Sequence, residues 1–146
     1  MKRTLTGLTA VAIILSSVSL VPAVEAAQSS VTTTFAKCST GVRNNCVVDG
    51  DTLWINGEKV RVADIDAPEI STPKCSSELA LGNEATRRLI ELVNEGPFQL
   101  QAWPGRDTDR YGRKLRVLVR DGHSLGDLLV REGLVRTWSG RREPWC

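Results

Sequence analysis

Alternating apolar and polar positions predict a β-hairpin in the first half of the chain. Two short apolar runs, at 47–48 and 52–55, lead to Asn56-Gly57, a strong signal for a two-residue hairpin turn. The return run at 59–63 places its valines on one face and Arg61 on the other. We therefore expect two paired strands with an apolar face toward the core.

A helical spacing of apolar residues follows a loop at 70–77. Between 78 and 95 apolar side chains recur every three or four residues, and Gly96-Pro97 stops this predicted helix. A second, short helix is expected where Ser124 can cap a leucine-rich segment and Gly133 can end it.

Further alternation predicts strands around these helices. The segments 98–103 and 115–119 alternate on either side of a polar loop at 104–113, and Asp121-Gly122 forms another tight turn. The segment 134–138 is a predicted final strand. The chain has no internal repeat, so we expect one α+β domain, mainly β: a small mixed barrel with two helices packed outside it.

The first 26 residues have the pattern of a secretory signal peptide. A basic start precedes an uncharged apolar stretch at 5–21, and small residues lead to an expected cleavage point after Ala26. The alternative is an uncleaved membrane anchor, but Thr, Ser and Gly interrupt the stretch and Pro22 follows it. We expect a periplasmic or secreted protein with no stable membrane association after cleavage.

The remaining length suits a single domain after a short leader. The segment 27–37 is rich in Ser, Thr and Ala and is expected to be a flexible leader, which leaves 38–146 as the folded domain.

The four cysteines, behind an export signal, indicate two disulfide bonds. Of the three possible pairings we favour Cys38–Cys46, which flank a short turn-forming segment, and Cys75–Cys146. Four-cysteine metal binding is the weaker alternative, because the chain has no Cys-x-x-Cys pair.

The amino-acid composition limits the kinds of catalytic site that the chain can form. The chain has 19 Lys and Arg against 17 Asp and Glu, which gives no global basic field. Its single histidine, His123, lies in a turn-like segment, which excludes a His-rich zinc site and disfavours a Ser-His-Asp or Cys-His triad. A catalytic metal would therefore be held by carboxylates, which favours a hard cation such as Ca²⁺ or Mg²⁺.

The near-neutral total hides a separation of charge. Six acidic and two basic residues occupy 49–69, a net charge of −4, whereas six basic and two acidic residues occupy 106–120, a net charge of +4. The simplest interpretation is that the two segments pair on a solvated surface. However, Asp51 and Asp66 lie at strand ends where a cation would relieve their repulsion. Arg61, near the same end, offers a fork for phosphate oxygens, so a site for a phosphate ester is expected.

Three motifs in order carry a family resemblance. They are the segment Val47-Val48-Asp49-Gly50-Asp51-Thr52, then Arg61 five residues before Asp66-Ala67-Pro68-Glu69, and then Asp107-Thr108-Asp109-Arg110-Tyr111-Gly112-Arg113. Each motif alone is weak, but together, between about Cys46 and Trp138, they strongly resemble the staphylococcal nuclease (thermonuclease) family.

The resemblance implies an OB-fold, a five-stranded barrel with two flanking helices, and Ca²⁺-dependent hydrolysis of phosphodiester bonds in DNA and/or RNA. It makes Asp51 and Asp66 the expected Ca²⁺ ligands, together with the backbone carbonyl of Ala67. Asp49 is expected to be a structural turn acceptor.

The resemblance also assigns roles to the other motif residues. Glu69 corresponds to the general base that acts on the attacking water, and Arg61 and Arg113 to the pair that holds the phosphate and stabilises the transition state. Arg110 and Tyr111 fall where the family contacts the nucleotide. Core packing is an equal alternative for Tyr111.

The chain also departs from the family pattern. Ala67 replaces a common Thr, and the segment 136–140 lacks the tyrosines that stack on bases in well-known members, so base preference does not carry over. The sequence stops at Pro144-Trp145-Cys146, before the long C-terminal helix of those members. We therefore expect the Cys75–Cys146 disulfide to secure this end.

Two functions of different classes remain. The first is an exported, monomeric Ca²⁺-dependent nuclease. The second is a catalytically silent OB-fold module that binds single-stranded nucleic acid or another polyanion. Three carboxylates beside a polyanion weaken binding unless a cation is present, which favours the nuclease. Preference for DNA or RNA, and internal or terminal cutting, stay open.

Overall fold

The computed structural model describes residues 29–146, so the expected signal peptide lies outside the described residues. The described part is an α+β fold with two helices, as predicted, and none of its helices is long and apolar enough to cross a membrane. The elements are β1 (Ser30–Val31), β2 (Ala36–Lys37), β3 (Cys46–Asp49), β4 (Thr52–Ile55), β5 (Glu58–Val62), β6 (Ile65–Asp66), α1 (Ser76–Asn94), β7 (Phe98–Ala102), β8 (Lys114–Arg120), β9 (His123–Ser124), α2 (Leu125–Arg131) and β10 (Arg136–Thr137).

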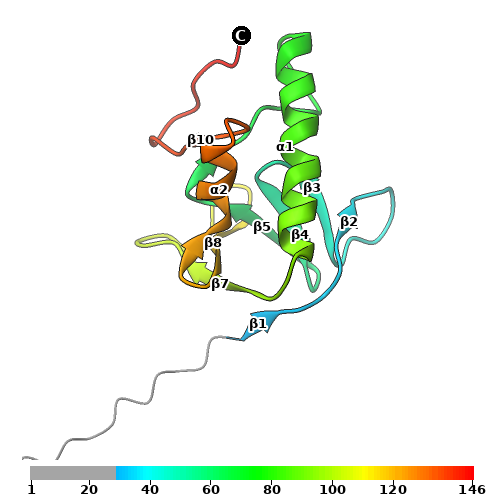
Figure 1. Ribbon diagram of the computed structural model, residues 1–146, viewed down its shortest axis with the longest axis vertical. Coiled ribbons are helices and arrows are strands. Elements are labelled where there is room, and N and C mark those ends of the chain that lie inside the picture. Colours follow the sequence, from blue (N-terminus) through cyan, green and yellow to red (C-terminus); the bar gives the residue numbers. More distant parts are fainter. Residues whose placement is uncertain (1–28) are drawn as a thin grey trace, which may run out of the picture.

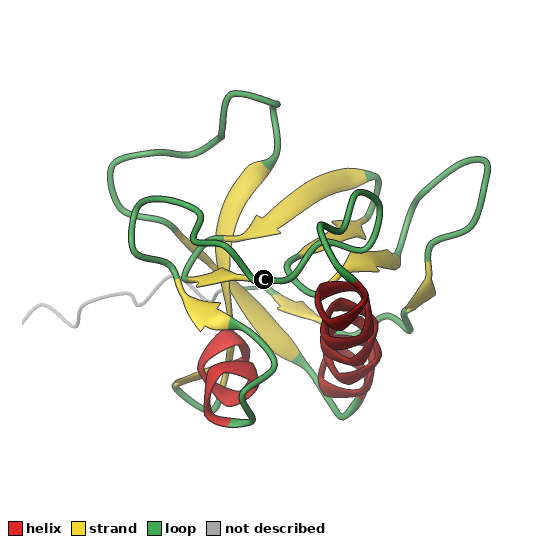
Figure 2. Ribbon diagram, turned by 90° about the horizontal axis from the view of Figure 1, so that it is seen from above, coloured by secondary structure: helices red, strands yellow, loops and turns green. Residues whose placement is uncertain are grey.

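One strongly curled, mixed sheet dominates the structure (Figure 1). Its strand order is β1-β7-β8-β5-β4-β3-β2, with β9 paired to β8, while β6 and β10 form a separate two-stranded sheet. The pairs β5–β8 and β2–β3 are parallel and the others are antiparallel. Both helices lie along one side of the curled strands (Figure 2). Within residues 29–146 no ladder joins β1 to β2, so hydrogen bonds do not close the expected barrel.

The two predicted turns have the conformation that their residues favour. Asn56 and Gly57 have φ angles of 49° and 82°, and Asp121 and Gly122 have φ angles of 50° and 76°. Positive φ at both central residues matches the right-handed twist of the flanking strands. The predicted hairpin β4–β5 and the predicted tight turn at Asp121-Gly122 are therefore confirmed, and the latter also joins β8 to the short strand β9.

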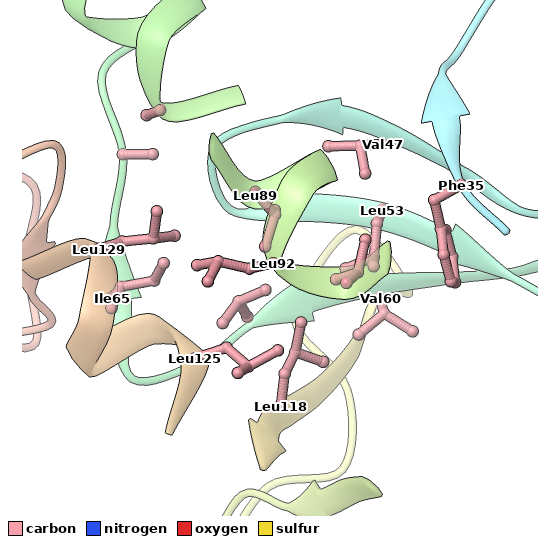
Figure 3. Close-up of a cluster of buried hydrophobic side chains, with 14 of the residues drawn as sticks. Phe35, Val47, Leu53, Val60, Ile65, Leu89, Leu92, Leu118, Leu125 and Leu129 are labelled. Atoms are coloured by element: carbon pink, nitrogen blue, oxygen red, sulfur yellow. The ribbon is translucent and has the colours of Figure 1, made fainter. Parts of the chain in front are cut away.

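The core lies between the sheet and the helices (Figure 3). Helix α1 contributes the stripe that its periodicity predicted, with Ala85, Leu89, Leu92 and Val93 buried, although it spans 76–94 rather than 78–95. The residues from other elements include Val47, Leu53, Val60, Val62, Ile65, Phe98, Leu118, Leu125 and Leu129.

The second helix begins and ends as predicted. The side chain of Ser124 accepts a hydrogen bond from the Asp127 N–H, which caps α2. At its other end Gly133 has a φ of 75°, and the Leu134 N–H donates to the Leu129 carbonyl at 3.0 Å. The expected final strand at 134–138 is therefore shorter than predicted, because this N–H belongs to the helix end. The ladder with β6 contains β10 alone, although the Trp138 N–H also donates to the Asp64 carbonyl at 2.8 Å.

The structure differs from the expected flexible leader between residues 29 and 37. Strand β1 pairs with β7, and β2 pairs with β3. Phe35 is 2% exposed, and its N–H and carbonyl both bond to the Asn94 side chain at 2.8 Å. Burial of one aromatic side chain contributes roughly 2 kcal/mol. Composition concealed this because Ser and Thr surround Phe35.

Two disulfides join the cysteines in the pairing that the sequence favoured. Cys38 is bonded to Cys46, and Cys75 to Cys146. The second bond brings the end of the C-terminal tail (138–146) to the start of α1 (Figure 1).

Candidate active site

Two buried aspartates form the base of the site. Asp51 lies in the turn between β3 and β4, Asp66 lies at the end of β6, and they are 2% and 3% exposed. The Asp51 carboxylate accepts hydrogen bonds from the Thr52 hydroxyl at 2.9 Å and from the Ala67 N–H at 3.0 Å. These bonds fix the backbone of Ala67 beside the Asp51 turn.

Asp49 supports this turn, as expected. Its carboxylate accepts the Asp51 N–H at 3.1 Å. Burial, with the nearby negative charges of Asp51 and Glu69, raises the pKa of Asp49 to about 7. Asp49 is therefore a turn acceptor that borders a strongly negative region.

Arg61 is the fixed counter-ion of both aspartates. Its Nη2 lies 3.3 Å from Asp51 Oδ2 and 3.8 Å from Asp66 Oδ1, and its Nη1 donates to the Ile65 carbonyl at 2.8 Å. Arg61 does lie opposite the valines of β5, but it is only 7% exposed. Its Cζ lies 5.7 Å from the centre of the Trp138 ring, which helps to cover it.

Glu69 lies in the loop after β6, and α1 holds that loop. The Glu78 carboxylate in the first turn of α1 accepts the N–H groups of Glu69 at 3.2 Å and Lys74 at 2.6 Å. The Glu69 side chain is 30% exposed, so water can reach it. Sequence patterns did not identify Glu78, although an acid in the first turn of a helix is a familiar signal.

Asp109 orients Arg113. Its carboxylate accepts the Arg113 Nε–H at 2.6 Å and the backbone N–H groups of Tyr111 and Arg113 at 2.9 and 3.0 Å. Burial alone would raise the pKa of Asp109, but these hydrogen bonds lower it. The oriented Arg113 donates to the Thr52 hydroxyl at 3.3 Å, which places the basic loop beside the Asp51 turn.

The two oppositely charged segments do not neutralise each other. Within the residues that the structure describes, no ion pair joins 49–69 to 106–120. Lys114 and Arg116 instead pair with Asp107 of their own segment. The simple interpretation of a paired, solvated surface is therefore wrong.

An arginine-rich pocket of about 300 Å³ lies next to the carboxylates. Tyr111 and Trp138 contribute aromatic walls, and Tyr111 is 68% exposed, so it is not a core residue. The Cζ atoms of its neighbours Arg110 and Arg113 lie 4.7 and 5.5 Å from its ring centre. Five arginines line the pocket: Arg61, Arg106, Arg110, Arg113 and Arg142.

Comparison with known proteins places this arrangement in a family. A family model described as "Staphylococcal nuclease homologue" matches residues 59–144. The chain belongs to the staphylococcal nuclease family. The match includes Arg61, Asp66, Glu69 and Arg113, whereas Asp51 precedes it.

Three curated relatives carry nuclease names. Endonuclease YncB of Bacillus subtilis (strain 168) is 41% identical over 93 residues, which cover 61% of this chain and 44% of that protein. The SPbeta prophage-derived endonuclease YokF of the same organism is also 41% identical over 93 residues, covering 61% of this chain and 31% of that protein. Micrococcal nuclease of Shigella flexneri is 38% identical over 76 residues, covering 49% of this chain and 38% of that protein. The chain thus spans less than half the length of each of these relatives.

The three expected acidic residues meet at one arginine that the family motifs did not indicate. Arg142, in the tail, pairs with Glu69, and it lies 3.3 Å from Asp66 and 3.9 Å from Asp51. The expected cysteine pairing already indicated that Arg142 could reach the site. If Cys75 pairs with Cys146, the tail that carries Arg142 must pass the loop between Glu69 and Cys75.

The Ca²⁺ that the staphylococcal nuclease family implies fits these residues. Asp66 Oδ1 is buried and accepts no hydrogen bond. Burial raises the pKa of Asp66, and the charge of Arg142 opposes that rise. The available donors are all oxygens, the ligands of a hard cation. Within residues 29–146 no group of three or more His, Cys, Asp or Glu side chains has the arrangement of a metal centre, and the guanidinium of Arg142 lies among the carboxylates instead.

Proposed function

We propose that this chain is an exported, Ca²⁺-dependent nuclease that hydrolyses phosphodiester bonds of DNA and/or RNA. The observation that carries the proposal is the pocket of five arginines directly beside Asp51, Asp66 and Glu69. A polyanion suits the arginine pocket, and a reactive phosphate suits the neighbouring carboxylates. The names of the three relatives described above agree with this chemistry.

Asp51, Asp66 and the backbone carbonyl of Ala67 would hold the cation. When bound, Ca²⁺ would offset the charge of the phosphate. Arg61, held rigidly by β5 and β6, and Arg113, oriented by Asp109, would bind phosphate oxygens and stabilise the charge that develops on them.

Glu69 would accept the proton of the attacking water. Its side chain is partly exposed, whereas the two aspartates are buried, so it is the acid that a water molecule can reach beside the phosphate. The loop bond from its N–H to Glu78 limits how far it can move.

Arg110 and Tyr111 would contact the nucleotide. Arg110 Nη2 donates to the Tyr111 hydroxyl at 2.5 Å, and the exposed ring offers a face on which a base can stack. We also assign the curled sheet to the OB-fold that the family implies. The two disulfides indicate an oxidising compartment. The proposal therefore includes export through the signal peptide to the periplasm or the exterior. It also includes a monomeric state.

Digestion of denatured DNA with Ca²⁺ and with a chelator tests the proposal. We expect cleavage only with Ca²⁺, and we expect Glu69→Gln to keep DNA binding but lose about 10²–10⁴-fold in turnover. Glu84→Gln is the matched control, because Glu84 is exposed on α1 and, within the described part of the chain, its one ion pair is with Arg87. Binding without cleavage under any divalent metal would instead identify the silent binding module.

A further inference from the structure

The C-terminal tail is anchored on both sides of Arg142. Upstream, β10 pairs with β6, so the tail begins next to Asp66. Downstream, the Cys75–Cys146 bond holds its end, and Arg136 Nη1 donates to the Pro144 carbonyl at 2.9 Å. The Arg136 Cζ also lies 3.8 Å from the centre of the Trp145 ring. The tail therefore holds Arg142 near the carboxylates and restricts how far it can move away.

Arg142 uses the oxygens that a cation would need. Asp66 Oδ1 has no hydrogen bond, and its nearest cationic atom is Arg142 Nε at 3.3 Å, closer than Arg61 Nη2 at 3.8 Å. The Glu69 carboxylate pairs with Arg142 alone among the ion pairs of the described residues. A divalent cation bound to these oxygens would repel the guanidinium and take its place.

A displaced Arg142 has an evident destination. Its side chain is 47% exposed, and it also lines the arginine pocket with Arg61 and Arg113. Because Arg142 already lines that pocket, a rotation of its side chain would direct the guanidinium toward a phosphate bound there. A charge-assisted, bidentate contact to phosphate is what a guanidinium does best.

We propose that Arg142 is a third phosphate-binding arginine, which rests on the carboxylates of Asp51, Asp66 and Glu69 until a divalent cation displaces it toward the substrate. The inference rests on the proposed function, since it concerns the same cation and phosphate. Arg142 is expected to oppose binding of the cation alone and to favour binding of the phosphate once the cation is present. Replacing Arg142 should therefore have opposite effects on the two affinities.

Calorimetric titration of the whole disulfide-bonded chain tests both effects. Ca²⁺ alone is titrated first, and then a single-stranded phosphorothioate oligonucleotide in saturating Ca²⁺. We expect Arg142→Gln to bind Ca²⁺ about tenfold more tightly and the oligonucleotide about tenfold more weakly, the scale of one charged hydrogen bond. Arg142→Lys should lie between wild type and Arg142→Gln in both titrations.

Arg141→Gln is the matched control. It removes the same charge from the neighbouring position, but the Arg141 side chain is 80% exposed and, among residues 29–146, forms an ion pair with Glu143 alone. It should leave both affinities within about twofold of wild type, as expected for an exposed pair. The double variant Cys75→Ser/Cys146→Ser keeps Arg142 but releases the tail, and it should also bind Ca²⁺ more tightly.

The outcomes separate this inference from the proposed function. If wild type binds Ca²⁺ and Arg142→Gln binds it with the same affinity, the role of Arg142 is overturned but the proposed function is not. Tighter Ca²⁺ binding without weaker oligonucleotide binding would also overturn it, because Arg142 would then be a counter-ion only. Wild type that takes up no Ca²⁺ would overturn the proposed function itself.

Discussion

Gly50 lies where the Asp51 turn, helix α1 and the Ala67 loop come closest. A Cβ atom at this position would lie 2.8 Å from the Ala85 Cβ and 2.9 Å from the Ala67 Cβ, closer than such atoms approach in proteins. Glycine therefore occupies the position between Asp49 and Asp51 because the surrounding backbone and alanine side chains are tightly packed.

Substitution Gly50→Ala should therefore destabilise the fold. We expect the free energy of unfolding to fall by about 1–3 kcal/mol, because the added methyl group forces α1 and the turn apart. Urea unfolding measures this. Gly96→Ala is the control, since the nearest atom to its added Cβ is Arg120 Nε at 3.8 Å. Equal destabilisation by the two variants would contradict the packing argument.

Asp109 orients Arg113, and through it would affect the proposed substrate. We expect Asp109→Asn to lower kcat about tenfold with little change in stability, because the guanidinium loses a charged partner that fixes its orientation. Steady-state cleavage of an oligonucleotide with Ca²⁺ measures this. Asp107→Asn makes the same charge change in the same loop but removes the partner of Lys114 and Arg116. Similar kinetics for both variants would remove the positioning role from Asp109.

At the level of elements, α1 orders the loop that carries Glu69. Cys75 provides no side-chain cap to this helix, and Glu78 in the first turn accepts the N–H groups of Lys74 and Glu69 instead. The bond from Lys74 is the main cause that holds the pKa of Glu78 below its usual value of 4.5, with the bond from Glu69 acting in the same direction against the effect of burial.

This lowered pKa predicts a pH dependence of stability. The stabilisation by ionised Glu78 is fully present above its unfolded-state pKa of 4.5, and it is lost as pH falls through the lower folded-state value. We therefore expect Glu78→Gln to be less stable than wild type at pH 7, with a difference that shrinks below about pH 4.5. Urea unfolding at several pH values checks this. A difference that is constant with pH would contradict it. Glu84→Gln should show a smaller effect, because the hydrogen bond from Arg87 that lowers the pKa of Glu84 lies on an exposed, solvent-screened pair.

The elements were predictable where the signal was local. Asn56-Gly57 and Asp121-Gly122 determine their own turns, and the periodicity of α1 reports its buried face. Strands β1 and β2 were missed because each has only two residues and depends on pairing with a distant strand. Phe35 packs because the sheet surrounds it, which local patterns do not show.

The site residues likewise include some that local motifs predict and some that depend on distant contacts. Asp51, Asp66, Glu69, Arg61 and Arg113 lie in motifs, so family resemblance singled them out. Arg142 lies in no motif and reaches the site only because a disulfide and the β6–β10 pair return the tail to it. The burial of Arg61 was likewise invisible, since Trp138 and the tail that cover it follow the rest of the domain in sequence.

For the whole molecule, the two disulfides should differ in their effect on stability. Cys75–Cys146 spans 71 residues and Cys38–Cys46 spans 8. Loop-closure entropy then predicts contributions of up to about 4 and about 2.5 kcal/mol respectively. Urea unfolding of Cys75→Ser/Cys146→Ser and Cys38→Ser/Cys46→Ser compares them. A smaller loss from the first pair than from the second would show that the tail separates from the domain without unfolding it.

The parallel pairing of β5 with β8 determines when the phosphate pocket can form. Arg61 on β5 is in register with Leu115 on β8, and α1 and β7 lie between them in the chain. Such distant pairings form late, because the entropy of closing the loop must be overcome before the contacts stabilise it. We therefore expect Arg61 and Arg113 to be brought into the same pocket late in folding. On the proposed function, a partly synthesised chain would lack the assembled pocket, and cleavage would begin only after folding.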